Sequence, residues 1–418
     1  MTELWNEIWQ TIRRNRLRSF MTAFGVFWGL LMLILLVGFG EGIFGGIVGS
    51  LSSIPSNSMF MGGNHTTMSY KGFGKGRSIE TDNDDLLLIR EAMGKKLESL
   101  TPMNFVNGSG LTYQDRKYDA TLVGTHGSYY NVLPQQLLYG RYINDIDLHE
   151  HRKVCVLGLD VYETLFPGGG DPCGKLVKAG GIYYTVVGVV KKLSALVNLG
   201  ADINRSVILP LSTTQLTYNL GDNIHMIIVT LKDQYSVSDL EDKILSGPKE
   251  HHFVHPDDKT AFWSFNLKEA LDSFKMLFAG INILLWIVGC GSLLAGLIGI
   301  SNIMLVTVKE RTQEIGIRRA LGAKPFTILS QILAESLALT MAAGLAGLML
   351  GVWILHLTDT ILKANPASPD EFSMQNPHIS FGVAVAALVV IVAGGLLAGS
   401  MPARRAMKIK AIEALREE

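Results

Sequence analysis

The chain has 418 residues, and its 37 Lys and Arg residues balance 37 Asp and Glu residues, so that the formal net charge is zero. Its basic residues form no continuous patch, and nucleic-acid binding therefore has no support. A hydrophobic content of 48% is what several membrane spans joined to a soluble domain would give.

Four uncharged runs are long enough to span a membrane, which needs about 20 predominantly apolar residues. They lie at 19–40, 276–308, 336–358 and 372–403, and the apolar part of the last is 379–401. The second run would form a helix of about 50 Å against a hydrocarbon core of about 30 Å, so it must protrude from the bilayer. The sequence therefore predicts an α-helical membrane protein with four transmembrane helices.

The first run is predicted to be an uncleaved anchor, because it exceeds a signal-peptide core and no A-x-A cleavage site follows. Basic residues in short loops indicate orientation, and they flank all four spans on one side. These residues are Arg13, Arg14, Arg16, Arg18, Lys309, Arg311, Arg318, Arg319, Lys324, Arg404, Arg405, Lys408, Lys410 and Arg416. The loop 359–378 contains only one Lys or Arg residue, Lys363. Both termini and the segment 309–324 are therefore predicted to be cytoplasmic.

The segment between the first two spans is then extracytoplasmic, and with more than 200 residues it can bury its own core. Strand-like runs alternate there with helix-like stretches. The strand-like runs are 154–157, 183–190, 207–209 and 226–231, and the helix-like stretches are 82–100 and 237–245. We therefore expect a large mixed α/β domain, and the pattern leaves its topology open.

In chain order the predicted parts are a cytoplasmic amphipathic helix (1–18), the first transmembrane helix (19–44), the extracytoplasmic or periplasmic α/β domain (45–265), a stalk with the second transmembrane helix (266–308), a short cytoplasmic helix (309–324), the third transmembrane helix (325–358), a short outer loop (359–378), the fourth transmembrane helix (379–402) and a cytoplasmic tail (403–418).

The stalk is predicted from apolar residues at helical spacing ahead of the second span, namely Leu267, Leu271, Phe274 and Phe278. A helix that runs unbroken from the outer domain to the cytoplasmic face can carry a push between them. An ordinary amphipathic helix leading into the membrane is the alternative.

The segment 309–324 combines a charged face with an apolar one. The charged face is formed by Glu310, Arg311, Glu314 and Arg318, and the apolar one by Ile317 and Leu321. Gly322 is a natural helix stop, and Pro325 then begins the next helix. This pattern is typical of a helix that docks on a cytoplasmic partner, and equally of a positively charged loop whose side chains reach the membrane interface.

Three stretches resemble the MacB-like family of ABC transporter permeases, which includes lipoprotein-releasing and FtsX-type permeases. They are NIMLVTVKERTQEIGIRRALGA at 302–323, PARRAMKIKAIEALR at 402–416 and EIWQTIRRNRLRSFMTAFGVFWG at 7–29. Four spans and a large domain between the first two complete the resemblance. Across 45–258 it rests on position and size only.

The resemblance implies a dimer, formed with a second copy or a paralogue, in which each permease binds a cytoplasmic ABC ATPase through 309–321. It implies that ATP and Mg²⁺ are bound by the ATPase and that no cofactor is bound by this chain. A periplasmic adaptor and an outer-membrane channel are further possible partners. We expect a multi-pass protein of the bacterial inner membrane that is not catalytic by itself, since no nucleophile, base and orienting residue stand out. The spans carry no interior charge, which argues against proton coupling.

Glycine-rich positions in the spans predict close helix packing. G-x-x-x-G pairs occur at Gly25 and Gly29, at Gly347 and Gly351, and at Gly395 and Gly399, and a longer ridge of small residues comprises Gly291, Ala295 and Gly299. Some of these positions could instead line a dimer interface.

Several polar motifs in the outer domain have a simpler interpretation than a binding site. His251, His252 and His255 could bind a metal if helical, but Pro248 and Pro256 predict a surface loop there. The carboxylates Asp82, Asp84 and Asp85 are typical of the first turn of a helix rather than of a calcium loop. The run GGDPCGKL at 169–176 lacks the Ser or Thr of a phosphate loop and is read as a glycine-rich turn. Cys155 and Cys173 either pair or remain two thiols.

Three functions remain open. The first is the permease of an efflux or extrusion machine, in which ATP hydrolysis by a separate ATPase moves the periplasmic domain of the permease. The second is release of lipoproteins, and the third is a relay that activates a cell-wall hydrolase. A relay should have a small outer domain, so the size of 45–265 favours the first two.

Overall fold

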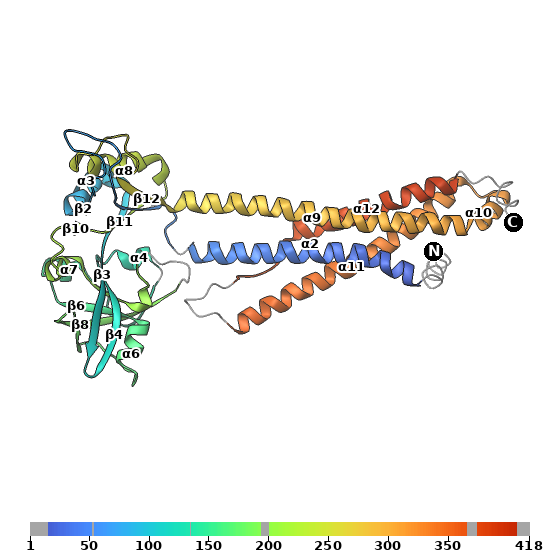
Figure 1. The fold of residues 1–418 in the computed structure, drawn as a ribbon. Helices are drawn as coiled ribbons and strands as arrows, with labels where there is room; N and C mark the ends of the chain where they lie inside the picture. The colour runs from blue at the N-terminus through green and yellow to red at the C-terminus, as the bar shows by residue number, and fades with distance from the viewer. Residues whose placement is uncertain (1–15, 52–53, 134, 194–199, 366–373, 408–418) are drawn as a thin grey trace. The chain divides into compact units, whose positions relative to one another are not determined.

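The computed structural model describes residues 16–51, 54–133, 135–193, 200–365 and 374–407. Most of the helix predicted at 1–18 and the chain beyond Met407 lie outside these residues. The described chain forms two compact units, one helical and one α/β, the second built mainly from 47–275 (Figure 1).

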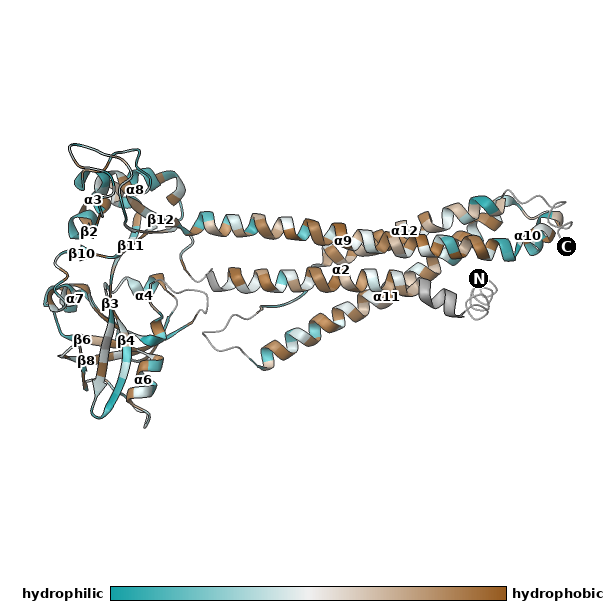
Figure 2. Cartoon of the chain, in the orientation of Figure 1, coloured by the Kyte–Doolittle hydropathy of each residue, from teal (hydrophilic) through white to brown (hydrophobic). Residues whose placement is uncertain are grey.

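The helical unit contains four helices that are long and apolar enough to cross a membrane. They are α2 (Arg16–Leu51), α9 (Leu267–Glu310), α11 (Pro325–Ala364) and α12 (Phe381–Met407). Their shared core includes Leu30, Ile34, Leu293, Ile332 and Ile391. Hydrophobic residues cover most of their length, and hydrophilic residues gather towards their ends (Figure 2). The prediction of four transmembrane helices is confirmed.

The α/β unit is built on one large mixed sheet. Its strand order is β12 (Phe262–Asn266), β1 (Ser58–Gly63), β11 (Met226–Leu231), β3 (Leu97–Tyr113), β4 (Arg116–Thr125), β9 (Ser206–Pro210), β6 (Val154–Gly158), β8 (Ile182–Lys192) and β5 (Gln135–Gly140), while β7 (Leu176–Ala179) pairs with β3 and β8. The pairs β4–β9 and β6–β8 are parallel, and the other pairs are antiparallel. The predicted mixed α/β domain between the first two spans is confirmed.

The strands nearest the two membrane helices pair with each other. β1 follows α2 and β12 precedes α9, and their antiparallel register sets Met59 opposite Asn266 and Gly63 opposite Phe262. The chain therefore enters and leaves the sheet on neighbouring strands.

Helices and short connections complete the α/β unit. They are α3 (Asn83–Met93), α4 (Tyr129–Val132), α5 (Asp145–His149), α6 (Leu159–Leu165), α7 (Leu211–Thr217) and α8 (Val237–His251), the 3-10 turns Gly94–Lys96 and Ile203–Arg205, and a small ladder of β2 (Thr81–Asp82) with β10 (Asn223–Ile224). Helices α3 and α8 share one apolar core with β1 and β11, through residues such as Ile89, Ile244 and Met61.

Two buried polar side chains stabilise loops of this unit through hydrogen bonds to several backbone groups. The Asn57 Nδ2 donates to the carbonyl oxygens of Leu231 and Lys232, both at 3.1 Å, and of Tyr235 at 2.7 Å, while its Oδ1 accepts from the Val237 amide at 3.0 Å. The carboxylate of Asp258 accepts from the backbone amides of Thr67, Met68 and Thr260. Burial opposes ionisation of Asp258, but these hydrogen bonds outweigh it and hold its pKa well below the usual range.

Sequence patterns account for several local features. Asp82 caps α3, because its Oδ1 accepts from the amides of Asp84 and Asp85 while Asp85 Oδ2 accepts from the amide of Asp82. The prediction of an acidic helix start is therefore confirmed. The glycine-rich run at 169–176 contains a turn and ends where β7 begins, with Gly169 and Gly174 at positive φ.

Two predictions in this unit were wrong. The helix predicted over 82–100 ends at Met93, because Gly94 adopts φ +50° and β3 begins at Leu97. The loop predicted around the three histidines begins later than expected. Pro248 lies inside the last turn of α8, where its missing amide removes one helical hydrogen bond, and His251 is the final residue of that helix. Cys155 and Cys173 are both free thiols, and burial raises the pKa of Cys173 to about 11.

Candidate functional site

The predicted cytoplasmic helix forms a compact connection between two membrane helices, which we call the junction. Helix α9 ends at Glu310, and α10 (Thr312–Ala320) begins immediately after Arg311, whose φ of −100° and ψ of 14° break the helix. Gly322 then adopts φ +94°, a conformation that glycine reaches without strain, and Pro325 starts α11. The chain therefore turns back into the membrane within a few residues.

Charged side chains of this junction face α11. The Arg311 Nη1 lies 3.6 Å from the Glu335 Oε2, and Glu335 is only 5% exposed. A buried carboxylate needs such a partner, since an isolated buried charge is strongly unfavourable. Glu335 of α11 therefore pairs with the basic segment that begins at Arg311.

A second ion pair lies beside the first. The Arg318 Nη2 contacts the Glu314 Oε1 at 2.7 Å, and the Arg318 Nη1 donates to the Gln331 Oε1 at 3.2 Å. These residues line a cleft together with apolar side chains of α9, α10 and α11, which we call the junction cleft. Its lining is Met304, Thr307, Val308, Arg311, Glu314, Ile315, Arg318, Ile328, Gln331, Ile332 and Glu335.

Helix α10 also contacts the end of the fourth membrane helix. The Arg319 Nη1 donates to the carbonyl oxygen of Met407 at 2.9 Å, where α12 ends. A guanidinium near the last carbonyls of a helix is electrostatically favourable. The junction is therefore bonded to α11 and α12 as well as to α9.

The apolar side chains predicted on α10 face outwards. Ile317 is 46% exposed, Leu321 is 84% exposed, and Phe326 at the start of α11 is 73% exposed. Glu310 is exposed as well. Of the six residues predicted for coupling, Arg311, Glu314 and Arg318 thus line the cleft, while Glu310, Ile317 and Leu321 lie on the surface. Gln331 also lines the cleft but could not be predicted from the sequence, because it lies in an otherwise ordinary stretch of α11.

The four predicted stalk residues occupy different surroundings. Leu267 is buried and Leu271 half-buried against the core of the α/β unit. The ring of Phe278 lies 4.9 Å from that of Phe44 in α2, between centroids. Phe274 is 38% exposed. The residues lie on one helix, α9, which runs on to the junction without a break.

The small residues of the spans also divide into two groups. A Cβ at Gly25 would lie 3.2 Å from the Gly296 Cα, and one at Gly29 would lie 3.0 Å from the Ser292 Oγ. A Cβ at Gly347 or Gly351 would similarly contact Phe27 or Ile34 of α2. A Cβ at Gly395 or Gly399 would contact Thr340 or Ser336 of α11. The ridge on α9 differs, because Gly291 and Ala295 are exposed and Gly299 is half-buried.

Family models match both parts of the chain. The MacB-like periplasmic core domain matches residues 19–246, and the FtsX-like permease C-terminal domain matches residues 286–411. The chain is 27% identical over 385 residues to the macrolide export ATP-binding/permease protein MacB of Bdellovibrio bacteriovorus, which covers 92% of this chain and 57% of that protein. It is 30% identical over 398 residues to the MacB of Neisseria meningitidis serogroup B, covering 92% of this chain and 56% of that protein.

Among solved structures, the periplasmic region of MacB from Actinobacillus actinomycetemcomitans matches at 21% identity with a TM-score of 0.44, over 55% of this chain and 97% of that one. The chain spans a little over half the length of the MacB proteins that it matches. The four apolar helices and the two family models make it an inner-membrane permease with a periplasmic α/β domain. The chain belongs to the MacB-like family of FtsX-type ABC transporter permeases.

Proposed function

We propose that this permease couples ATP hydrolysis by a cytoplasmic ABC ATPase, carried on a separate chain, to movement of its periplasmic domain, and so drives efflux or extrusion of a substrate. The observation that carries the proposal is the junction cleft. It joins the end of α9, the helix that continues from the periplasmic domain, to α11 through the ion pair of Arg311 with the buried Glu335. A displacement of α10 therefore moves both helices together.

The distribution of basic residues supports the sidedness. Arg318, Arg319 and Lys324 lie at the junction, and Arg404 and Arg405 lie near the end of α12, whereas Lys363 stands at the opposite end of α11. Positive residues in short loops favour the cytoplasmic side. The junction and both termini are then cytoplasmic, where ATP is available.

The exposed apolar side chains of α10 form the proposed docking surface for the ATPase. Ile317, Leu321 and Phe326 would be buried by a partner, while Glu310 would lie at the rim. Interfaces of this kind place apolar anchors centrally and polar residues around them. In this proposal ATP and Mg²⁺ are bound by the ATPase.

A second copy of the permease is proposed to pack on the ridge of Gly291, Ala295 and Gly299. The other glycine pairs already pack against neighbouring helices of the same chain, whereas Gly291 and Ala295 of this ridge are exposed and Gly299 is half-buried. Small residues allow close approach of membrane helices. The name of the relatives suggests macrolides as one substrate class to test. A periplasmic adaptor and an outer-membrane channel are further partners that we propose from the family resemblance.

The coupling proposal is tested by reversing the cleft pair with Glu314→Lys and Arg318→Glu together. The reversal keeps two opposite charges at i and i+4 but removes the guanidinium that donates to Gln331. We expect normal expression and at least a tenfold loss of permease-stimulated ATP hydrolysis, measured in lipid nanodiscs with the ATPase encoded beside the permease.

The matched control is Asp359→Lys with Lys363→Asp, which reverses another i, i+4 pair of 2.6 Å at the far end of α11. It should leave stimulation unchanged. Normal hydrolysis and normal transport in the cleft double mutant would overturn the assignment of α10 as the coupling element.

A further inference from the structure

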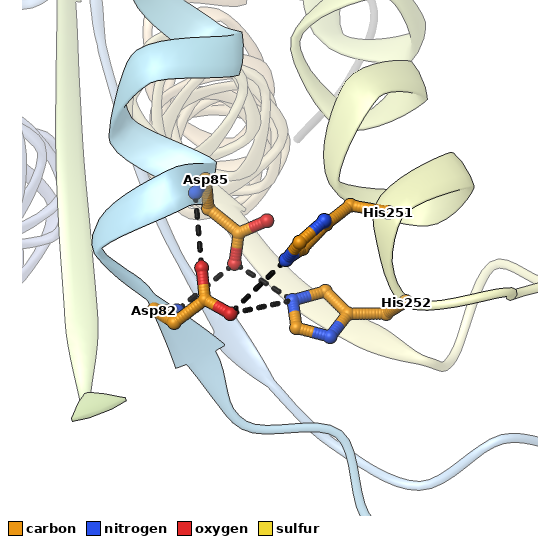
Figure 3. A group of neighbouring side chains, drawn as sticks. All are labelled: Asp82, Asp85, His251 and His252. Atoms are coloured by element: carbon orange, nitrogen blue, oxygen red, sulfur yellow. Dashed lines mark hydrogen bonds and ion pairs between the residues drawn. The ribbon is translucent and has the colours of Figure 1, made fainter. Parts of the chain in front are cut away.

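Two carboxylates and two imidazoles converge in the periplasmic domain, away from the junction cleft. Asp82 caps α3 and Asp85 lies in its first turn, while His251 ends α8 and His252 follows it. Figure 3 shows the four side chains pointing towards one another. One ligand atom from each residue lies within 4.8 Å of all the others.

The individual distances suit a shared cation. The His251 Nε2 lies 3.1 Å from the Asp82 Oδ2, and the His252 Nε2 lies 2.9 Å from the Asp85 Oδ2 and 4.0 Å from the Asp82 Oδ2. In a tetrahedral zinc site with bonds of about 2.1 Å, ligand atoms are about 3.4 Å apart. The observed separations bracket this value, so small side-chain rotations would bring the four atoms around one ion.

Asp85 supplies a second, independent indication of a ligand. It is completely buried, and its Oδ1 has no hydrogen-bond partner among the described residues. Its Oδ2 is already shared by the Asp82 amide and His252. An unpartnered carboxylate oxygen in the interior is unfavourable, and a divalent cation beside it would remove that cost.

The surrounding structure holds the ligands in place. The capping box fixes Asp82 and Asp85 relative to each other, since each accepts from the backbone of the other. Arg77 donates to the carbonyl oxygens of His252 and Phe253 and so fixes the end of α8. Outer-shell contacts of this kind orient metal ligands and strengthen binding.

We propose that Asp82, Asp85, His251 and His252 bind one divalent transition-metal ion of the zinc class. Imidazole nitrogens and carboxylate oxygens are suitable ligands for such ions. The ion would join the start of α3 to the end of α8 and stabilise this part of the periplasmic domain. The proposal is independent of coupling to the ATPase.

His255 is the natural control, because it belongs to the same histidine-rich segment and does not join the cluster. Its Nδ1 lies 3.9 Å from an Asp257 carboxylate oxygen, and its ring meets that of Tyr70 edge-on at 5.3 Å. If binding requires the four-residue arrangement rather than any surface histidine, only substitutions at His251 and His252 will affect it.

The test uses full-length, tag-free permease in nanodiscs, stripped with a chelator and titrated with Zn²⁺ by calorimetry at pH 7.5, with bound metal counted by elemental analysis. We expect one Zn²⁺ per chain at micromolar concentration. His251→Ala and His252→Ala should each weaken binding at least tenfold, and His255→Ala less than twofold. Zn²⁺ should raise the unfolding temperature of the wild type and of His255→Ala only.

His251 is the main variant because its side chain is 34% exposed, so truncation should leave the fold intact. Circular dichroism without metal checks this point. No binding up to 100 µM Zn²⁺ in folded wild-type protein would overturn the proposal, and so would equal affinity in all three variants. The four residues would then form only an Asp–His hydrogen-bond network.

Discussion

The helical unit and the α/β unit hold their backbones together by different means. In the helical unit, helices approach each other closely at glycines. A Cβ at Gly347 would lie 2.6 Å from the Phe27 carbonyl oxygen, and one at Gly296 would lie 2.8 Å from the Val26 amide nitrogen. In the α/β unit, buried polar side chains such as Asn57 and Asp258 bind several backbone groups at once. Added atoms should therefore damage the first unit most, and removed polar atoms the second.

Removing the amide of Asn57 should give the largest effect. Asn57→Ala leaves the carbonyls of Leu231 and Tyr235 and the amide of Val237 without their partner, at a site that is 8% exposed. We expect a loss of about 3 kcal/mol in the free energy of unfolding of the α/β unit. Hydrogen exchange measured by mass spectrometry should show faster exchange at the start of α8.

The exposed Asn131 offers the control for this substitution. Asn131→Ala should change stability by less than about 0.5 kcal/mol. If Asn57→Ala were as mild as Asn131→Ala, hydrogen bonding by single buried side chains would not be what fastens this unit.

Adding one methyl group to the helical unit should have the next largest effect. Gly347→Ala sets a Cβ against the backbone of α2, and relief requires the two helices to separate. Overpacking of this kind costs about 2 kcal/mol. A lower midpoint of thermal unfolding in detergent, with less folded protein recovered, would measure it.

Gly291 sharpens the contrast, since a Cβ there meets nothing within 4 Å. Gly291→Ala should leave the fold unaffected. Gly291→Leu should also leave it unaffected but weaken association of two copies, which single-molecule photobleaching in bilayers can count. Equal loss of fold in Gly347→Ala and Gly291→Ala would contradict the division of small residues into two groups.

Acid should weaken the α/β unit through His126. Burial, assisted by the charge of Arg90, lowers the pKa of His126 to about 4, so the unfolded chain binds more protons between that value and about 6.5. Stability from this residue is present above pH 6.5 and is lost as the pH falls towards 4. Between pH 7.5 and 5.5 the expected loss is roughly 1 kcal/mol.

Other histidines also have shifted pKa values. Burial lowers the pKa of His225. Burial also opposes protonation of His252, but the hydrogen bond to Asp85 and the charges of Asp85 and Asp82 together raise its pKa. Comparison with His126→Asn isolates the one residue. Urea midpoints at the two pH values should differ more in the wild type than in the variant. Identical differences would place His126 outside the acid response.

The membrane part of the fold could be predicted from the sequence because its signal is local. An uncharged run such as 276–308 must be a span whatever surrounds it, and basic residues at its end indicate its orientation. The strand order could not be predicted, because β4–β9 and β6–β8 pair in parallel across long sequence separations. The hydrophobic pattern predicts where a strand lies in the sequence, but not which strand it pairs with in the sheet.

The two sites differ in the same way. Arg311, Glu314 and Arg318 were predicted because they share one short helix, whereas Gln331 entered the cleft through the packing of α11. The Asp–His cluster was missed because it joins residues more than 160 positions apart. The cluster also requires α8 to continue past Pro248, whereas a proline at that position predicts the end of a helix.

The pairing of β1 with β12 has a consequence for how this protein can vary. The two ends of the periplasmic segment, Ser58 and Asn266, lie on adjacent strands, which are about 4.8 Å apart. Everything between them is therefore an insertion whose ends already meet, as in domains that tolerate exchange between proteins. A family of such permeases can replace its periplasmic module while the membrane helices keep one common design.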